Sequence, residues 1–152
     1  MREAFAVAAR DKYSAVLTID ADLQHPPHHL PEFIAADGDI VIGTRTFTLR
    51  IMPLSRVVTN FLTSIIISIW SGCIIHDSQS GYRLLKVSLL SQLAMRSGRY
   101  DFESELLFRA GKLPIRVRDV PIETIYEGSA SYINPMHDTL RFIRLIWQRL
   151  WY

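Results

Sequence analysis

Short apolar runs that alternate with helix-like segments restrict the fold of this chain more than any other feature. Residues 14–19 form a run that ends at Asp20, and Ile40–Ile42 form a second run that ends at Gly43. Such runs are typical of strands buried on both faces of a parallel sheet. Residues 115–122 alternate in polarity, which indicates a strand with one solvated face. Segments with helical spacing separate the runs, so the sequence predicts an α/β domain with a mostly parallel sheet flanked by helices.

The composition is that of one folded domain in a reducing compartment. The chain has 152 residues, of which 49% are hydrophobic, and a net charge of +2, which is too apolar and too weakly charged for a disordered segment. Its one cysteine, Cys73, cannot form an internal disulfide. We expect a cytoplasmic protein, since the first residues lack the apolar core of a signal peptide. Without a glycine-rich phosphate loop or a basic, aromatic surface pattern, we expect no nucleic-acid partner.

One uncharged run, Val57–Ile75, is long enough to cross a membrane. It contains several hydroxyl side chains and one amide side chain, and Gly72 lies near its end. These polar residues favour a buried helix over a membrane-spanning segment.

Two acidic residues, Asp20 and Asp22, follow the first predicted strand directly, and Gln24 comes two residues later. Residues two apart in extended backbone point the same way, so that both carboxylates can bind one divalent cation. Ligands of α/β sheets bind beyond the carboxyl ends of the strands. The three residues are therefore predicted ligands of Mg²⁺ or Mn²⁺, although the same pattern by itself also occurs in ordinary acidic loops.

The residues around this pattern resemble the metal-binding stretch of the family 2 glycosyltransferases. Residues 17–27 read Leu-Thr-Ile-Asp-Ala-Asp-Leu-Gln-His-Pro-Pro. The similarity is to the branch of dolichol- and polyprenol-phosphate sugar transferases, which is typified by dolichol-phosphate mannose synthase. Later segments agree with this branch in the same order: Val41–Arg45, Asp77–Arg83, Phe102–Glu105, Val120–Ile122 and Gly128–Ser131.

The resemblance implies a GT-A-like fold and a metal-dependent, inverting glycosyltransferase. Such an enzyme moves a sugar of the mannose or glucose type from a nucleotide-sugar to a polyprenyl or dolichyl phosphate. The resemblance also implies that Asp20, Asp22 and Gln24 hold the metal against the donor diphosphate, with Asp22 among the catalytic residues. It further implies that the nucleotide-binding first part of the family domain is absent, so that residues 1–135 correspond to the C-terminal part of the catalytic domain.

Two arginines, Arg45 and Arg56, lie in a stretch without acids, residues 40–76. A guanidinium can bind a phosphate through two parallel hydrogen bonds. The resemblance implies that both arginines hold the acceptor phosphate. Arginines that cover apolar surface are the alternative interpretation.

Two further acids are candidate catalytic residues. Asp77 can orient a loop, accept a proton or cap a turn, and Arg83 is its expected ion-pair partner. The resemblance places Asp77 near the acceptor. Glu105 is a candidate general base, which a sugar hydroxyl needs and an anionic phosphate does not. The role of Glu105 therefore distinguishes an enzyme that acts on a lipid phosphate from one that acts on a sugar hydroxyl of a cell-envelope glycan. A non-catalytic remnant that binds a membrane or a partner chain is the third alternative.

Three histidines, His25, His28 and His29, raise the question of a zinc site. No fourth ligand stands at a standard spacing, and two prolines constrain the turn. The sequence therefore argues against zinc at these residues.

Residues 136–152 predict an amphipathic helix, because apolar residues recur at helical spacing and arginines lie on the other side. The pattern fits a helix on a membrane surface and equally a core-packing helix at the end of a chain. With a lipid-phosphate acceptor, the first interpretation implies a peripheral protein at the cytoplasmic face of a membrane.

Overall fold

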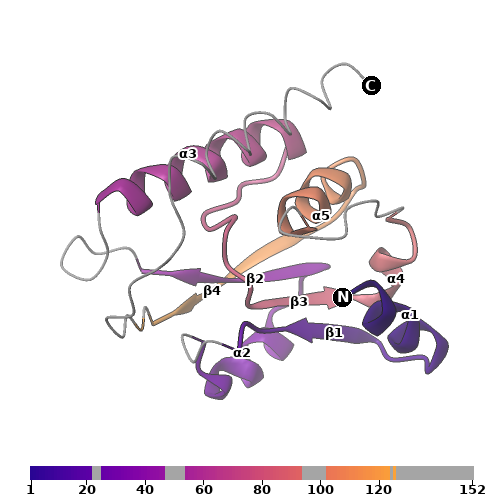
Figure 1. Cartoon of the computed structure of the whole chain (residues 1–152). Coiled ribbons are helices and arrows are strands. Elements are labelled where there is room, and N and C mark those ends of the chain that lie inside the picture. Colours follow the sequence, from indigo (N-terminus) through magenta and orange to yellow (C-terminus); the bar gives the residue numbers. More distant parts are fainter. Residues whose placement is uncertain (22–24, 47–53, 94–101, 124, 126–152) are drawn as a thin grey trace.

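The computed structural model describes residues 1–21, 25–46, 54–93, 102–123 and 125. Within these ranges the chain forms one sheet with helices on both sides (Figure 1). The elements are α1 (Arg2–Arg10), β1 (Ala15–Thr18), η1 (Pro27–His29), α2 (Leu30–Ala35), β2 (Ile40–Arg45), α3 (Leu54–Ser71), β3 (Arg83–Lys86), α4 (Val87–Leu90), α5 (Phe102–Ala110) and β4 (Val117–Ile122).

The sheet is mixed and has the strand order β1-β3-β2-β4. β2 and β4 pair in parallel, whereas β3 pairs antiparallel with both β1 and β2. The predicted α/β class is confirmed, and the arrangement is consistent with a GT-A-like fold. β1, β2 and β4 run in one direction, as predicted, but the pairing is mainly antiparallel because β3 lies between β1 and β2.

β3 is the strand that the sequence pattern did not predict. A polar, turn-rich segment precedes it, and the short α4 follows it directly. Arg83 begins the strand and is only 2% exposed. Its guanidinium donates hydrogen bonds to the carbonyl oxygens of Ser78 and Ser80, which makes its burial tolerable. The two neighbouring strands, rather than local apolar pattern, hold this segment extended.

Apolar side chains form a core cluster on each face of the sheet. Neighbouring residues of a strand point to opposite faces, so Ile40 and Ile42 join the larger cluster and Val41 joins the smaller one. The larger cluster includes side chains of α1, α3, α4 and α5, and the smaller one includes Phe33 of α2. Figure 1 shows α3 and α5 on one side of the sheet and α2 on the other.

Helix α3 carries most of the long uncharged run and turns a largely polar side inward. Asn60, Thr63 and Ser64 are buried, whereas Phe61 is 63% exposed and Ile69 is 73% exposed. The expectation of a buried apolar helix is therefore wrong for one face of α3, because its polar side chains bind the neighbouring loop. None of the helices in the described part of the chain combines the length and the apolar character that a bilayer span requires.

The strands bring four chain segments together at one end of the sheet. Arg83, the first residue of β3, pairs with Thr18 of β1 and with Ile42 of β2. The carboxyl ends of β1, β2 and β4 therefore lie at the same end as the amino end of β3. We call it the Arg83 end of the sheet.

Asp39 connects three strands at the opposite end. Its carboxylate accepts a hydrogen bond from the Lys86 ammonium at 3.0 Å and from the backbone N–H of Arg116 at 2.8 Å. The bond from the Arg116 backbone, followed by that from Lys86, holds the pKa of the Asp39 carboxyl below its ordinary value. The carboxylate therefore stabilises the fold at neutral pH, since the unfolded chain binds its proton more readily.

Replacing Asp39 with asparagine is expected to lower the free energy of unfolding by about 1 kcal/mol at pH 7. A depressed pKa gives stability that is complete above the pKa of the unfolded chain, about 3.9, and that disappears as the pH falls through the lower pKa of the folded state. Urea unfolding from pH 7 to pH 2.5 measures the difference between the two proteins. An equal difference at every pH would contradict this account.

Candidate functional site

Asp20 lies just beyond β1, at the Arg83 end of the sheet. Its Oδ2 is 3.4 Å from Nε2 of His25, whose side chain is buried, while the Asp20 side chain is 57% exposed. The hydrogen bond with His25 holds the pKa of the Asp20 carboxyl below its ordinary value, and the charges of Arg45 and Arg83 act in the same direction against the opposing effect of partial burial. The site thus keeps an ionised, accessible carboxylate at the end of a strand.

Two of the three predicted metal ligands, Asp22 and Gln24, lie outside the described residues. The structure therefore places only Asp20 of this set. His25, one of the three histidines that raised the question of zinc, is its ion-pair partner. The signal was present in the sequence, since His25 directly follows the Asp-x-Asp-x-Gln pattern.

Gly81 lets the carboxylate of Asp20 pack directly against the backbone of the loop before β3. A Cβ atom at Gly81 would overlap the Asp20 carboxyl group. Among the described glycines, the one with a positive φ is Gly72. Gly81 is therefore needed for close approach rather than for a left-handed turn. Thr18 supports the contact, because its hydroxyl donates to the carbonyl oxygen of Gly81 at 2.9 Å.

An open pocket of about 350 Å³ adjoins Asp20. Asp20, Thr18 and Arg83 contribute polar groups to its lining, and the rest is mainly apolar. Leu106 of α5 is one of the apolar lining residues. Polar and apolar residues thus line the pocket beside Asp20.

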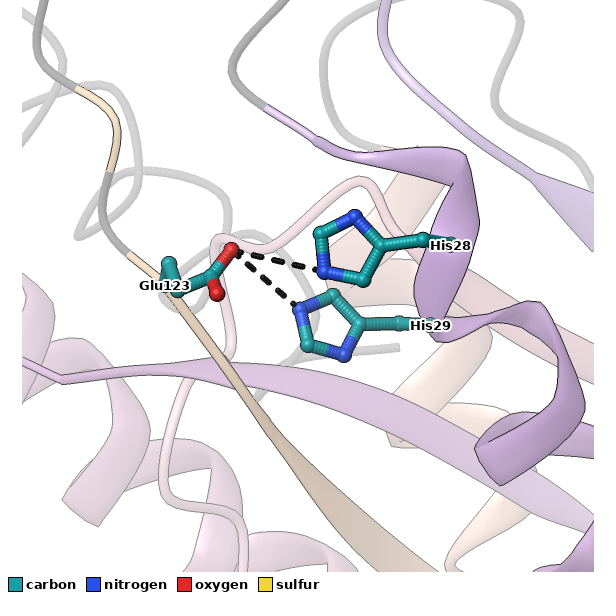
Figure 2. Close-up of side chains that lie close together, drawn as sticks. All are labelled: His28, His29 and Glu123. Atoms are coloured by element: carbon teal, nitrogen blue, oxygen red, sulfur yellow. Dashed lines mark ion pairs between the residues drawn. The ribbon is translucent and has the colours of Figure 1, made fainter.

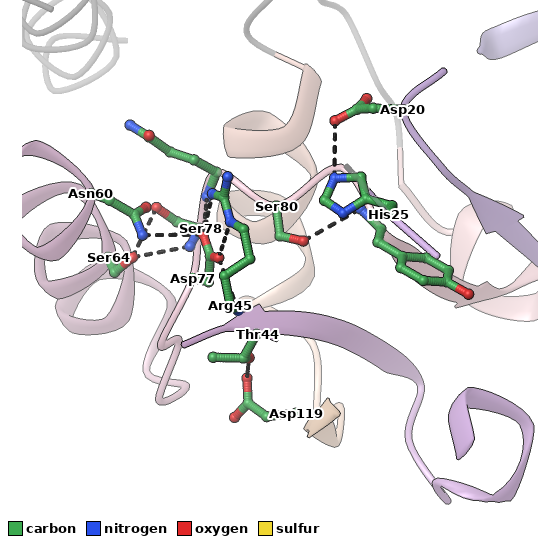
Figure 3. Close-up of polar contacts among 12 residues, drawn as sticks. Asp20, His25, Thr44, Arg45, Asn60, Ser64, Asp77, Ser78, Ser80 and Asp119 are labelled. Atoms are coloured by element: carbon green, nitrogen blue, oxygen red, sulfur yellow. Dashed lines mark hydrogen bonds and ion pairs between the residues drawn. The ribbon is translucent and has the colours of Figure 1, made fainter. Parts of the chain in front are cut away.

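Arg45, the last residue of β2, forms a two-point ion pair with Asp77 (Figure 3). Its Nε and Nη2 donate to the two carboxylate oxygens of Asp77 at 2.7 and 3.0 Å, and Asn60 of α3 donates to the same carboxylate at 3.1 Å. The Asp77 side chain is fully buried, and that of Arg45 is 17% exposed. The exposed part of the pair therefore belongs to Arg45, whose guanidinium the buried carboxylate holds in one orientation.

This geometry corrects the expected pairing of Asp77 with Arg83. The ion-pair partner of Asp77 is Arg45, and the Arg83 guanidinium binds loop carbonyl groups, as described above. Asn60 was missed because it stands in an apolar run, although an amide on the buried side of a helix is itself a signal of a buried polar partner.

Hydroxyl groups on α3 fix the loop that carries Asp77. The backbone N–H of Ser78 donates to the hydroxyl of Ser64 at 2.9 Å, and the hydroxyl groups of the two residues lie 3.1 Å apart. The hydroxyl of Ser78 also lies 3.3 Å from that of Thr63. These bonds explain the polar, buried side of α3. They give the Arg45–Asp77 pair a rigid support from the neighbouring helix.

Glu105 lies on α5 and is 2% exposed. Its Oε1 accepts a hydrogen bond from Nε of Arg109, one helical turn later, at 2.7 Å. A general base must reach the hydroxyl that it deprotonates. A buried carboxylate that is paired with an arginine is better suited to holding α5 than to that task.

The remaining predicted groups lie outside what the structure describes. Arg56 is on α3, but its side chain is not among the described ones. The Gly128–Ser131 loop and residues 136–152 fall outside the described ranges as well. Their predicted roles stay predictions.

No protein-family model matches the chain. Several curated proteins with similar sequences nevertheless have related names. The chain is 35% identical to the UDP-N-acetylglucosamine–dolichyl-phosphate N-acetylglucosaminyltransferase of Methanococcus voltae, over 86% of this chain and 56% of that protein. It is 31% identical to the undecaprenyl-phosphate mannosyltransferase of Micrococcus luteus, over 72% of this chain and 49% of that protein.

A third relative is the polyprenol monophosphomannose synthase of Mycolicibacterium smegmatis, which is 31% identical over 74% of this chain and 46% of that protein. The chain therefore spans about half the length of the curated relatives that it matches. All three names describe transfer of a sugar to a polyprenyl-type carrier.

Proposed function

This chain belongs to the polyprenol-phosphate branch of the family 2 glycosyltransferases, and we propose that it forms part of an enzyme that transfers a sugar from a nucleotide-sugar to a polyprenyl phosphate. One observation carries the proposal: an ionised carboxylate, Asp20, just beyond β1, and an oriented guanidinium, Arg45, at the end of β2, lie at the Arg83 end of one sheet. A reaction between a metal-bound diphosphate and an anionic acceptor requires both kinds of group.

The residues at the end of β1 fit a magnesium or manganese ion. Asp20 offers a carboxylate oxygen that is accessible and whose low pKa keeps it charged. Both metals prefer oxygen ligands and retain water or phosphate oxygens in their coordination shell. Asp20, together with Asp22 and Gln24, would hold the ion, which when bound neutralises the diphosphate that leaves the sugar. His25 orients Asp20 from its buried side.

Arg45 binds the phosphate of the lipid acceptor in this proposal, and Asp77 is a positioning residue that acts through it. The fully buried carboxylate accepts hydrogen bonds from Nε and Nη2 of Arg45 and thereby fixes the orientation of the guanidinium plane. Arg56 is the second proposed phosphate ligand, from the family resemblance. The phosphate oxygen then attacks the anomeric carbon in line with the departing diphosphate, which inverts the configuration at that carbon.

The position of Glu105 favours a phosphate acceptor over a sugar hydroxyl. An anionic phosphate oxygen needs no base, whereas a hydroxyl group does. Glu105 is buried and paired with Arg109, which supports a structural role for it. The identity of the donor sugar, of the mannose or glucose type, rests on the family resemblance alone.

A transfer assay tests the proposal and the role of Arg45 together. With the whole gene product, manganese and a nucleotide-sugar, we expect product on a short polyprenyl phosphate and none on a free oligosaccharide. Arg45→Lys is expected to lower kcat/KM for the lipid acceptor about 10- to 100-fold, because an ammonium cannot form two parallel hydrogen bonds to the acceptor phosphate. The KM for the donor should stay the same.

Arg118→Lys is the matched control, since Arg118 is exposed on β4, and its kinetics should equal those of the parent. Transfer only to a glycan would replace the acceptor in this proposal. Absence of metal binding and of turnover with any donor would point instead to a non-catalytic remnant.

We also propose that α3 contacts the membrane in which the lipid acceptor resides. Its exposed side presents a row of large apolar side chains at helical spacing, and such patches mark protein or membrane contacts. The residues of this α3 patch are Val58, Phe61, Leu62, Ile65 and Ile69, each at least 38% exposed. An apolar patch on a helix that does not cross the bilayer suits a protein that binds peripherally to the cytoplasmic face of a membrane.

Vesicle binding tests the α3 patch. Replacing Phe61 and Ile69 together with serine is expected to weaken partition onto phosphatidylcholine–phosphatidylglycerol vesicles at least tenfold, since each buried side chain contributes about 1.5–3 kcal/mol. Ile34→Ser serves as the control, because Ile34 is 68% exposed on α2, on the other side of the sheet. Equal partition of both variants in a sedimentation assay would rule out this contact.

A further inference from the structure

Two neighbouring histidines and a distant glutamate converge on one point beside η1. His28 and His29 end η1, and Glu123 directly follows β4. The Nε2 atoms of His28 and His29 lie 3.6 and 3.5 Å from the same carboxylate oxygen of Glu123 (Figure 2). The three side chains offer ligand atoms that all lie within 4.8 Å of one another. Residues that are far apart in the sequence thus present two imidazole nitrogens and one oxygen to a common space.

The environment of His29 indicates that this cluster is a preformed ligand site. Its side chain is 9% exposed, and its Nε2 has no hydrogen-bond partner in the described structure although it is buried. Buried polar atoms without a partner are rare and require an explanation. The atom points toward Glu123 and lies 3.5 Å from its carboxylate without forming a hydrogen bond to it.

The other nitrogen of His29 faces a second carboxylate. Nδ1 lies 3.4 Å from Oε2 of Glu32, which is one helical turn further along. A carboxylate at Nδ1 favours the proton on that nitrogen and leaves the lone pair on Nε2. Histidines that bind metal ions almost always donate their second N–H in this way.

We propose that His28, His29 and Glu123 bind a divalent transition-metal ion, and that zinc is the ion they fit best. Two imidazoles and one carboxylate suit zinc, whereas magnesium and manganese prefer oxygen ligands alone. With bonds of about 2.0–2.1 Å, the ligands of a tetrahedral zinc ion are separated by about 3.3–3.4 Å, close to the 3.5 and 3.6 Å found here. Water or a fourth group would complete the coordination.

The spacing of residues along the sequence argued against zinc, because no fourth ligand stands at a standard spacing from the three histidines. The third ligand comes instead from the end of β4, which the parallel pairing of β2 with β4 brings to the Arg83 end of the sheet. The bound ion would join η1 to the end of β4. It would thereby hold η1 at the Arg83 end of the sheet. The proposal rests on no part of the proposed transferase activity.

Metal titration of the whole chain, first stripped with a chelator, tests the site. Zinc alone is added in competition with a chromophoric chelator, and cobalt alone is added as a spectroscopic probe. We expect one zinc per chain with micromolar or tighter affinity, and visible cobalt absorption typical of nitrogen ligation in four- or five-coordinate geometry. His28→Ala and Glu123→Gln are each expected to weaken zinc binding at least tenfold.

These two variants are suitable because both side chains are more than 60% exposed, so that neither change removes a buried group. The matched control is His76→Ala, since His76 is also an exposed histidine beside an acid, 2.7 Å from Asp119. It should bind zinc as the parent does. Unchanged affinity in His28→Ala and Glu123→Gln would overturn the proposal, and so would the lack of saturable binding of zinc and cobalt by the parent. In that case the cluster would be an ion pair of protonated histidines only.

Discussion

Replacing Asp77 with alanine is expected to lower the free energy of unfolding by about 3–5 kcal/mol, because it leaves the Arg45 guanidinium without its buried counter-charge. Asn60 loses its partner as well. In a domain whose total stability is of the order of 5–15 kcal/mol, this is one of the largest effects available to a single substitution. The midpoint and slope of urea unfolding measure it.

A double variant separates the structural effect from the functional one. Removing both charges, in Asp77→Ala with Arg45→Met, is expected to restore much of the stability, since a buried ion pair is itself costly to desolvate. Transfer to the lipid phosphate should remain lost in the double variant, because the guanidinium is absent. If stability and activity were to recover together, Arg45 would have no part in binding the acceptor.

The second large effect is expected at Asp20. Asp20→Ala should lower turnover about 10³-fold, which corresponds to about 4 kcal/mol of transition-state stabilisation, and should change the free energy of unfolding little, since the side chain is more than half exposed. Manganese titration of the activity should show weaker metal dependence as well. Unchanged turnover in a protein whose parent requires manganese would remove Asp20 from the site.

Gly81 offers an independent way to test the same carboxylate. A methyl group at Gly81 would displace the carboxyl group of Asp20, so Gly81→Ala should lower activity through Asp20. In a double-mutant cycle, Gly81→Ala should therefore add almost no further loss to Asp20→Ala. Independent, additive losses would mean that Gly81 acts on another part of the site.

Much of the strand pattern could be predicted from short-range features of the sequence. The runs that became β1 and β2 are apolar and rich in β-branched residues, and such runs are strands in most contexts. β3 could not be predicted in this way. Arg83 is buried in it only because carbonyl groups of the preceding loop accept its hydrogen bonds, and no local pattern encodes that.

Local sequence patterns likewise indicate some residues of the candidate site and miss others. The acid at the end of β1 and the arginine at the end of β2 are visible as residues that follow apolar runs. The partner of Arg45 was predicted wrongly, because an ion pair depends on which loop folds over the strand end. The roles of Asp22, Gln24 and Arg56 stay predictions that rest on the family resemblance.

Local composition and periodicity alone specify the α/β class and the carboxylate just beyond β1, because strand propensity and the position of a polar residue after an apolar run are short-range properties. Only the folded chain decides that Asp77 holds Arg45, that α3 turns polar groups inward, and that Glu123 meets His28 and His29. These contacts join residues from separate elements. Their formation depends on strand order and register, which long-range packing determines and which the residues of one segment do not encode.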